Sequence, residues 1–440
     1  MSLRPPTVIP GNQHSISLQQ IDPDALKVLH RLQRFDYASY LVGGSVRDLL
    51  LGRFPKDFDI GTSAHPSQVK RLFRNCWIIG RRFRLAHIKF GLKTIEVATF
   101  RSQALQLWPP KSKPSITPDH TAEKNVPKQR SDELYEHRSP TPIKHGLAKE
   151  TRHPFSGENT FGTAEEDAFR RDFTINALFY DVSTSSITDY VGGLHDLKNR
   201  LIRCIGDPDE RFPEDPVRML RAVALAARLQ FKIDPPTYKA IRRHRATITQ
   251  SSPTRLLEEV YKILRSGVSN RTFRMLDKAG LLNHISPELT KHQTAVLWHS
   301  LEKLDLYRGQ FGTAPATLTT PILLGTLLVP VINLERHPFE TDGSRITLGI
   351  LPLAHRHVRR LRQIVRLQRR MLDAELSYGT QRKLMSRDVY HEAFTWLEIH
   401  EHSSEAIERW RALGKTAGAH LNHLKTKSRR RRSRKPLTHV

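Results

Sequence analysis

Two glycines and two aspartates, separated by one short helical stretch, constrain this chain more than any other feature. Residues 40–42 are apolar and strand-like, Gly43 and Gly44 predict a tight turn, and residues 46–51 are typical of a helix that ends at a glycine. Residues 57–60, Asp-Phe-Asp-Ile, alternate as a second strand does, which would place both carboxylates on one face. Such a turn, at the start of a helix, lets backbone N–H groups approach an anion, and the carboxylate pair suits a divalent cation.

Each half of this pattern has a common structural explanation. Two glycines after a strand usually form only a turn, and an Asp-x-Asp sequence usually lies in a solvated loop. Their combination, with a helix between them, is far more specific and favours a phosphate cradle beside a metal site. Nucleotidyl transfer requires that arrangement, because two cations can bridge the attacking and departing oxygens.

The charge of the chain points to a polyanionic partner. Its 440 residues include 71 Lys and Arg against 44 Asp and Glu, which gives a net charge of +27. This excess argues against an ordinary enzyme of a small neutral substrate. It favours nucleic acid first and an anionic membrane surface second.

Cysteine usage and hydropathy predict a soluble, cytoplasmic protein. Cys76 and Cys204 lie far apart and form no metal-ligand pattern, so we expect reduced, buried thiols. No apolar segment follows Arg4 as it would in a signal peptide. Residues 322–332 are too short to span a bilayer, and a core helix is the better interpretation.

A predicted hairpin carries a further acidic residue. Residues 85–90 and 94–100 alternate as two strands joined by a turn at Gly91. Glu96 lies inside the second strand. It is either a cross-strand salt-bridge partner or a third carboxylate of the metal site, and spacing alone favours neither.

Two segments lack the pattern of a packed core. Residues 103–157 are rich in Pro, Lys, Ser, Thr and His, so we expect a disordered insertion within the first domain. Residues 425–435 are basic and have no apolar periodicity, which predicts a disordered arm that tethers RNA. That arm contains Arg429, Arg430, Arg431 and Arg432.

Charged residues next to core positions mark two more candidate sites. Arg171 and Asp172 follow a capping-box sequence; such a cluster is usually a salt-bridge network, but these two could also hold a ribose and a triphosphate. Asp215 is expected to cap a helix that begins at Pro216. The residues alone favour a salt bridge from Asp215 to Arg218 over a pair that reads a base edge.

The C-terminal half is helical by its periodicity and carries a dense basic stretch. Residues 354–376 alternate leucine and isoleucine with arginine, which predicts a helix with one apolar and one basic face. A basic face is usually only solvated, but this density favours contact between phosphates and Arg359, Arg362 and Arg366.

Four segments resemble the motifs of the class II nucleotidyltransferases, the superfamily of bacterial poly(A) polymerases and CCA-adding enzymes. They are residues 43–48 (Gly-Gly-Ser-Val-Arg-Asp), 57–59 (Asp-Phe-Asp), 170–177 (Arg-Arg-Asp-Phe-Thr-Ile-Asn-Ala) and 214–222 (Glu-Asp-Pro-Val-Arg-Met-Leu-Arg-Ala). Residues 79–88 are similar to the segment that marks the poly(A) polymerase branch. The chain departs from the family in its long insertion after Phe100, and in Ala224-Leu225, where the family usually has Arg-Phe.

The resemblance implies an α+β fold. An N-terminal nucleotidyltransferase head with a small mixed sheet of five strands would precede all-α neck, body and tail regions. The expected divisions are an extended arm (1–15), the head (16–205), a neck that binds the nucleotide base (206–270), a body that binds RNA (271–415) and a disordered basic tail (416–440).

The resemblance also implies roles for individual residues. Asp57 and Asp59 would bind two Mg²⁺ ions, with Glu96 as a further catalytic carboxylate. It raises base reading by Asp215 and Arg218 above the simple salt bridge. The expected ATP-binding residues are Gly43, Gly44, Arg47, Asp48, Arg171, Asp172, Asn176, Asp215, Arg218 and Arg221.

The implied activity is template-independent addition of AMP from ATP to RNA 3′ ends, which would promote RNA decay in bacteria. A CCA-adding tRNA nucleotidyltransferase shares every core motif and is the first alternative. A non-catalytic RNA-binding protein is the second. The expected partners are RNA 3′ ends and ATP, with RNA-decay proteins as further candidates, and the expected state is a monomer.

Overall fold

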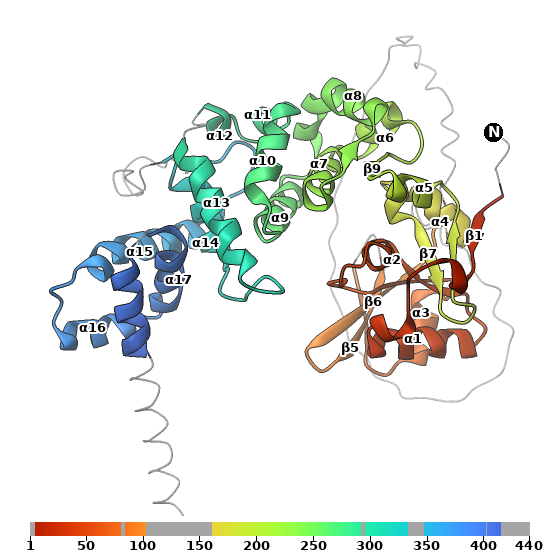
Figure 1. Ribbon diagram of the computed structural model, residues 1–440, viewed down its shortest axis with the longest axis horizontal. Helices are drawn as coiled ribbons and strands as arrows, with labels where there is room; N and C mark the ends of the chain where they lie inside the picture. Colours follow the sequence, from red (N-terminus) through yellow and green to blue (C-terminus); the bar gives the residue numbers. More distant parts are fainter. Residues whose placement is uncertain are drawn as a thin grey trace, which may run out of the picture.

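The chain forms a mixed sheet followed by a succession of helices that lead away from it (Figure 1). The computed structural model describes residues 5–80, 84–102, 161–291, 295–332, 347–401 and 403–414. The predicted insertion at 103–157 and the basic tail at 416–440 lie outside the described residues. Within them, the predicted α+β fold is confirmed.

The sheet of the head is larger than expected: the described residues form eight strands where five were predicted. They are β1 (Thr7–Ile9), β2 (Ser39–Val42), β3 (Asp59–Thr62), β4 (Cys76–Ile79), β5 (Leu85–Phe90), β6 (Lys93–Thr99), β7 (Leu178–Asp181) and β8 (Ser186–Asp189). Their order is β1-β8-β7-β2-β3-β6-β5-β4, and β3 and β6 pair in parallel while the other neighbours are antiparallel. Part of the expected N-terminal arm is therefore a strand, because β1 pairs with β8. The predicted β5–β6 hairpin is confirmed.

The described residues of the head form five α-helices. They are α1 (Pro23–Arg34), α2 (Gly44–Leu50), α3 (Pro66–Leu72), α4 (Ala164–Arg170) and α5 (Gly193–Lys198). Helix α1 begins where it does because the Asp22 carboxylate accepts hydrogen bonds from the backbone of Asp24 and Ala25, with proline at its first position. Its buried residues pack on β2 and β3, and α3 packs on β4 and β5.

Most of the described residues that follow the head are helical. Their helices are α6 (Pro208–Glu214), α7 (Val217–Leu229), α8 (Pro235–His244), α9 (Pro253–Leu264), α10 (Ser269–Lys278), α11 (Leu282–Ile285), α12 (Pro287–Lys291), α13 (Ala295–Gly309), α14 (Thr320–Leu328), α15 (His355–Leu372), α16 (Tyr378–Met385) and α17 (Tyr390–His400). A short parallel pair, β9 (Leu201–Ile202) with β10 (Lys232–Ile233), joins the head to these helices. The predicted neck is thus not wholly helical.

Several predictions about the core are confirmed. Helix α14 occupies most of the apolar stretch at 322–332, and the residues of its apolar segment are buried. Cys76 and Cys204 are buried and not paired in a disulfide. Burial raises the pKa of the Cys204 thiol to about 11. In the described part of the chain, every helix is too short or too polar to cross a membrane.

Candidate active site

The glycine turn joins β2 to α2, as predicted. Gly43 has a φ of +75°, a conformation that glycine adopts most readily, and its N–H donates to the carbonyl of Leu178 at 3.2 Å. A Cβ added at Gly43 would lie only 3.0 Å from Nη1 of Arg171. The absence of a side chain therefore lets the Arg171 guanidinium lie against the turn.

Arg47 supports this turn from inside the protein. Its side chain is buried; Nε donates to Oδ1 of Asp48 at 2.8 Å, and Nη1 donates to Oδ1 of Asn176. Burial lowers the pKa of Arg47, and the charge of Asp48 opposes that fall. Because its guanidinium is engaged by both partners, Arg47 orders the turn and orients Asn176 in this structure.

Asp57 and Asp59 lie at the start of β3, but the prediction that both belong to the strand is wrong. Strand β3 begins at Asp59, which pairs with Val42, the last residue of β2. The chain of β2 turns away at the glycines, so Asp57 has no partner on β2. Phe58 and Ile60 are buried as predicted, which leaves the two aspartates outside the core.

Glu96 lies beside Asp59 on the neighbouring strand. Ile60 of β3 pairs with Val97 of β6, and both point into the core, so the residues before them share the opposite face. Desolvation, followed by the charges of Glu96 and Asp57, raises the pKa of Asp59 to about 6. Carboxylates that repel one another in this way favour a bound cation.

Glu96 also has the cross-strand contact that was the alternative explanation for it. Its Oε1 lies 3.6 Å from Nε2 of His87 on β5. Among the described residues, no three His, Cys, Asp or Glu side chains are arranged to hold a metal ion. The predicted ligands, Asp57 and Asp59, thus lie together at the start of β3, with Glu96 adjacent on β6.

The segment after α4 connects the turn to the helical region. Arg171 donates to Asp167 at 3.0 Å and to the carbonyl of Asn176 at 3.1 Å. Asp172 accepts from the side chain of Asn176 at 3.3 Å and pairs with Arg221 of α7 at 2.9 Å. One continuous network thus contains Arg47, Asp48, Arg171, Asp172, Asn176 and Arg221.

The predicted pair of Asp215 with Arg218 does not form. Helix α7 begins at Val217, and Asp215 instead ends α6 in an extended conformation. Arg218 donates to Glu214 at 2.8 Å and to the carbonyl of Arg211 at 2.9 Å, while Asp215 pairs with Arg255 of α9 at 3.0 Å. Each member of the expected pair is anchored by a different residue.

Sequence reasoning missed helix α6 and therefore missed Arg211. This buried guanidinium donates to the carbonyls of Arg170 at 2.8 Å and Arg171 at 3.1 Å, so it ties the head segment to the neck. The signal was present in Asp207-Pro208. The Asp207 side chain caps α6, and proline is its first residue.

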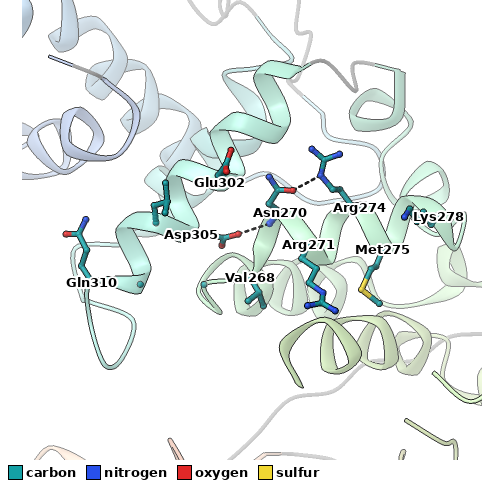
Figure 2. Close-up of a pocket in the computed structure, with 12 residues that line it drawn as sticks. Val268, Asn270, Arg271, Arg274, Met275, Lys278, Glu302, Asp305 and Gln310 are labelled. Carbon is teal, nitrogen blue, oxygen red and sulfur yellow. Dashed lines mark hydrogen bonds between the residues drawn. The ribbon is translucent and has the colours of Figure 1, made fainter. Parts of the chain in front are cut away.

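A separate cavity lies between α10 and α13 (Figure 2), and these helices lie apart from the sheet of the head (Figure 1). Its volume is about 1050 Å³. Asp305 of α13 caps α10 by accepting from the backbone N–H groups of Ser269 at 2.7 Å and Asn270 at 2.9 Å. Arg274 lies 4.5 Å from the ring centroid of Trp298. None of the predicted site residues lines this cavity.

Comparison with known proteins identifies the family. The poly A polymerase head domain matches residues 39–203, and a domain described as "Probable RNA and SrmB- binding site of polymerase A" matches residues 230–293. Poly(A) polymerase I of Escherichia coli O157:H7 is 45% identical over 288 residues, which are 66% of this chain and 55% of that protein. The chain belongs to the poly(A) polymerase and CCA-adding enzyme family.

Other members of the family are more distant. The CCA-adding enzyme of Lactobacillus helveticus is 33% identical over 252 residues, which are 57% of this chain and 52% of that enzyme. The crystal structure of Bacillus stearothermophilus CCA-adding enzyme in complex with CTP aligns with a TM-score of 0.58 at 24% identity, over 89% of this chain and 82% of that one. That likeness supports the fold. The chain spans little more than half the length of the curated relatives it matches.

Proposed function

We propose that this protein transfers AMP from ATP to the 3′-hydroxyl of RNA without a template. The Asp57–Asp59 pair carries the proposal, because it lies beside the glycine turn and the Arg171–Asp172 network inside the matched head domain. The similarity to poly(A) polymerase I, at 45% identity against 33% for a CCA-adding enzyme, supports adenylate as the nucleotide added.

In the proposed reaction, the RNA 3′-oxygen forms a bond to the α-phosphorus of ATP, and the bond to pyrophosphate breaks. Mg²⁺ at Asp57 and Asp59, two ions in our proposal, would stabilise the phosphate charge and lower the pKa of the attacking hydroxyl. The chain itself supplies a turn without side chains at Gly43 and Gly44, and the Arg171 guanidinium lies beside this turn. Asp172, held by Arg221, would orient the ribose.

Incorporation of labelled ATP into RNA tests whether the protein is an enzyme at all. We expect label on the 3′ end of an RNA oligonucleotide when magnesium is present, and none on the same RNA with a 3′-deoxy end. An intact chain that binds the oligonucleotide but adds no nucleotide, with ATP or with any other nucleotide, would support the non-catalytic alternative instead.

Helix α15 and its neighbours form the proposed RNA contact in the body. Leu361, Ile364 and Leu367 are buried as predicted, which leaves Arg359 and Arg366 exposed and Arg362 half-buried. Further exposed cations lie on α10, within the matched RNA-binding domain: Arg271, Arg274 and Lys278. The predicted tail residues Arg429–Arg432 lie outside the described residues.

Neutralising part of this basic surface should reduce the salt dependence of RNA binding. Arg366 and Arg370 line a hollow of about 440 Å³ together with Arg387. The double variant Arg366→Gln with Arg370→Gln is expected to lower the slope of log affinity against log salt by about 1.4. Each phosphate contact to a single strand contributes about 0.7 to that slope. A matched pair of exposed cations on α1, changed as Lys27→Gln and Arg34→Gln, should leave the slope unchanged. Equal slopes for the two double variants would contradict the contact.

Four further expectations belong to the proposal. The proposed division into head, neck, body and tail keeps the predicted boundaries, a monomer is the proposed state, and RNA-decay proteins are the proposed protein partners. A cytoplasmic location is proposed as well. The proposal that RNA 3′ ends and ATP are the substrates does not depend on any of these expectations.

A further inference from the structure

One face of the sheet near Asp59 and Glu96 carries solvent-exposed side chains. Along β5 and β6, buried residues alternate with residues that reach the surface, and α3 packs against β4 and β5. This open face is formed by β4, β5 and β6, at the end of the strand order opposite to β1.

The strand registers place four polar or aromatic side chains in one row across this face. Trp77 of β4 pairs with His87 of β5, and His87 pairs with Glu96 of β6. Glu96 is the neighbour of Asp59 on β3. Adjacent strands lie about 4.8 Å apart, so the row runs about 14 Å from Asp59 to Trp77.

The outer end of the row has the chemistry of a nucleic-acid contact. Trp77 is 48% exposed, which is unusual for so large an apolar ring, and Ile79 on the same strand is also exposed. The ammonium of Lys89 lies 5.0 Å from the centroid of the Trp77 ring. Single-stranded nucleic acids bind to such surfaces because a base stacks on the ring and a phosphate pairs with the cation.

We propose that this open face seats the 3′-terminal segment of the RNA substrate, with a base stacked on Trp77 and a phosphate beside Lys89. The proposal rests on the proposed function, because it takes an RNA 3′ end as the substrate. The row then directs the strand toward Asp59, where the reacting hydroxyl has to lie. A second copy of this chain, paired along the edge strand β4, is the alternative occupant of the same surface.

Binding of a non-extendable oligoadenylate tests the proposal without catalysis. Fluorescence anisotropy with a 3′-deoxy oligoadenylate, in magnesium and without ATP, is expected to show about tenfold weaker binding for Trp77→Ala. Trp77→Phe should retain most of the affinity, because phenylalanine still stacks. Lys89→Gln should lower the salt slope by about 0.7. Phe35→Ala, which removes an exposed aromatic residue at the end of α1, should bind as the unaltered protein does.

Equal oligoadenylate affinity for Trp77→Ala and the unaltered protein would overturn the proposal. Sedimentation distinguishes the alternative: a change of oligomeric state with unchanged RNA affinity would assign the face to contacts between copies. Trp77 is exposed, so its loss should leave the thermal transition in place, and a melting curve confirms this. Failure of nucleotide addition by the unaltered protein would refute the proposed function while leaving the binding result to stand on its own.

Discussion

Asp57→Asn and Asp59→Asn should each reduce nucleotide addition by roughly three orders of magnitude or more, because charge stabilisation by a bound metal supplies several kcal/mol to the transition state. Each change keeps the size of the side chain but removes one of two anionic ligands. The measurement is single-turnover extension of a labelled RNA at saturating ATP and magnesium. Glu96→Gln separates its two interpretations, since a cross-strand partner of His87 should tolerate the change far better than a metal ligand would.

The same substitutions should show that lost activity is not lost folding. The pKa of Asp59 is raised to about 6 in the folded protein. In magnesium-free buffer, the free energy of unfolding should therefore fall as the pH rises from the ordinary Asp range through about 6, because the folded protein resists ionisation of this carboxyl. Asp59→Asn should therefore melt at a higher temperature than the unaltered protein at pH 7.5. The difference should vanish near pH 3.5, where the carboxyl is protonated in both states. Substantial turnover by either variant, with magnesium supplied, would exclude the metal assignment.

Arg218→Ala is expected to raise the KM for ATP by roughly one to two orders of magnitude and to weaken discrimination against CTP, because a well-oriented donor to a base edge contributes about 1–3 kcal/mol of discrimination. In the structure, Glu214 orients the Arg218 guanidinium, because it accepts from both Arg218 and Arg211 at 2.8 Å. Burial opposes ionisation of Glu214, but the hydrogen bond and charge of Arg218, with the charge of Arg211, prevail and lower its pKa.

Glu214→Gln tests that positioning role. It removes the charge that holds Arg218 and should raise the KM for ATP less than Arg218→Ala does, with kcat largely retained. Lys239→Ala, which removes an exposed cation from neighbouring helix α8, is the matched control and should change neither constant. If Arg218→Ala leaves both the KM for ATP and the ratio of ATP to CTP use unchanged, Arg218 does not read the base.

The sequence predicted the turn, the buried residues of the sheet and the position of the two aspartates outside the core, because each depends on neighbouring residues. Gly43 has the positive φ that a tight turn after a strand requires, and Phe58 and Ile60 are buried by simple alternation. The extent of β3 could not be read in this way. It depends on where β2 ends and stops offering hydrogen bonds, which is a property of the paired strand.

Long-range pairing explains the other differences. Asp215 and Arg218 are close in sequence, and local spacing predicted their salt bridge. In the structure, Asp215 pairs instead with Arg255, which is forty residues away in the sequence. Arg218 pairs with Glu214, the last residue of helix α6, which the sequence did not predict. Likewise, β1 extends the sheet only because the distant β8 offers an edge, so a three-residue strand carried no signal of its own.

Nucleotide and primer selection test the central proposal most directly. An unstructured RNA ending in A, and separately a tRNA lacking its 3′ end, should each be offered with ATP alone, CTP alone or both, and the products resolved by length. The account predicts long, heterogeneous A tails on the unstructured RNA, with CTP used poorly. A product that requires CTP, stops after the CCA end on tRNA and is absent from the unstructured RNA would contradict it and establish a CCA-adding enzyme.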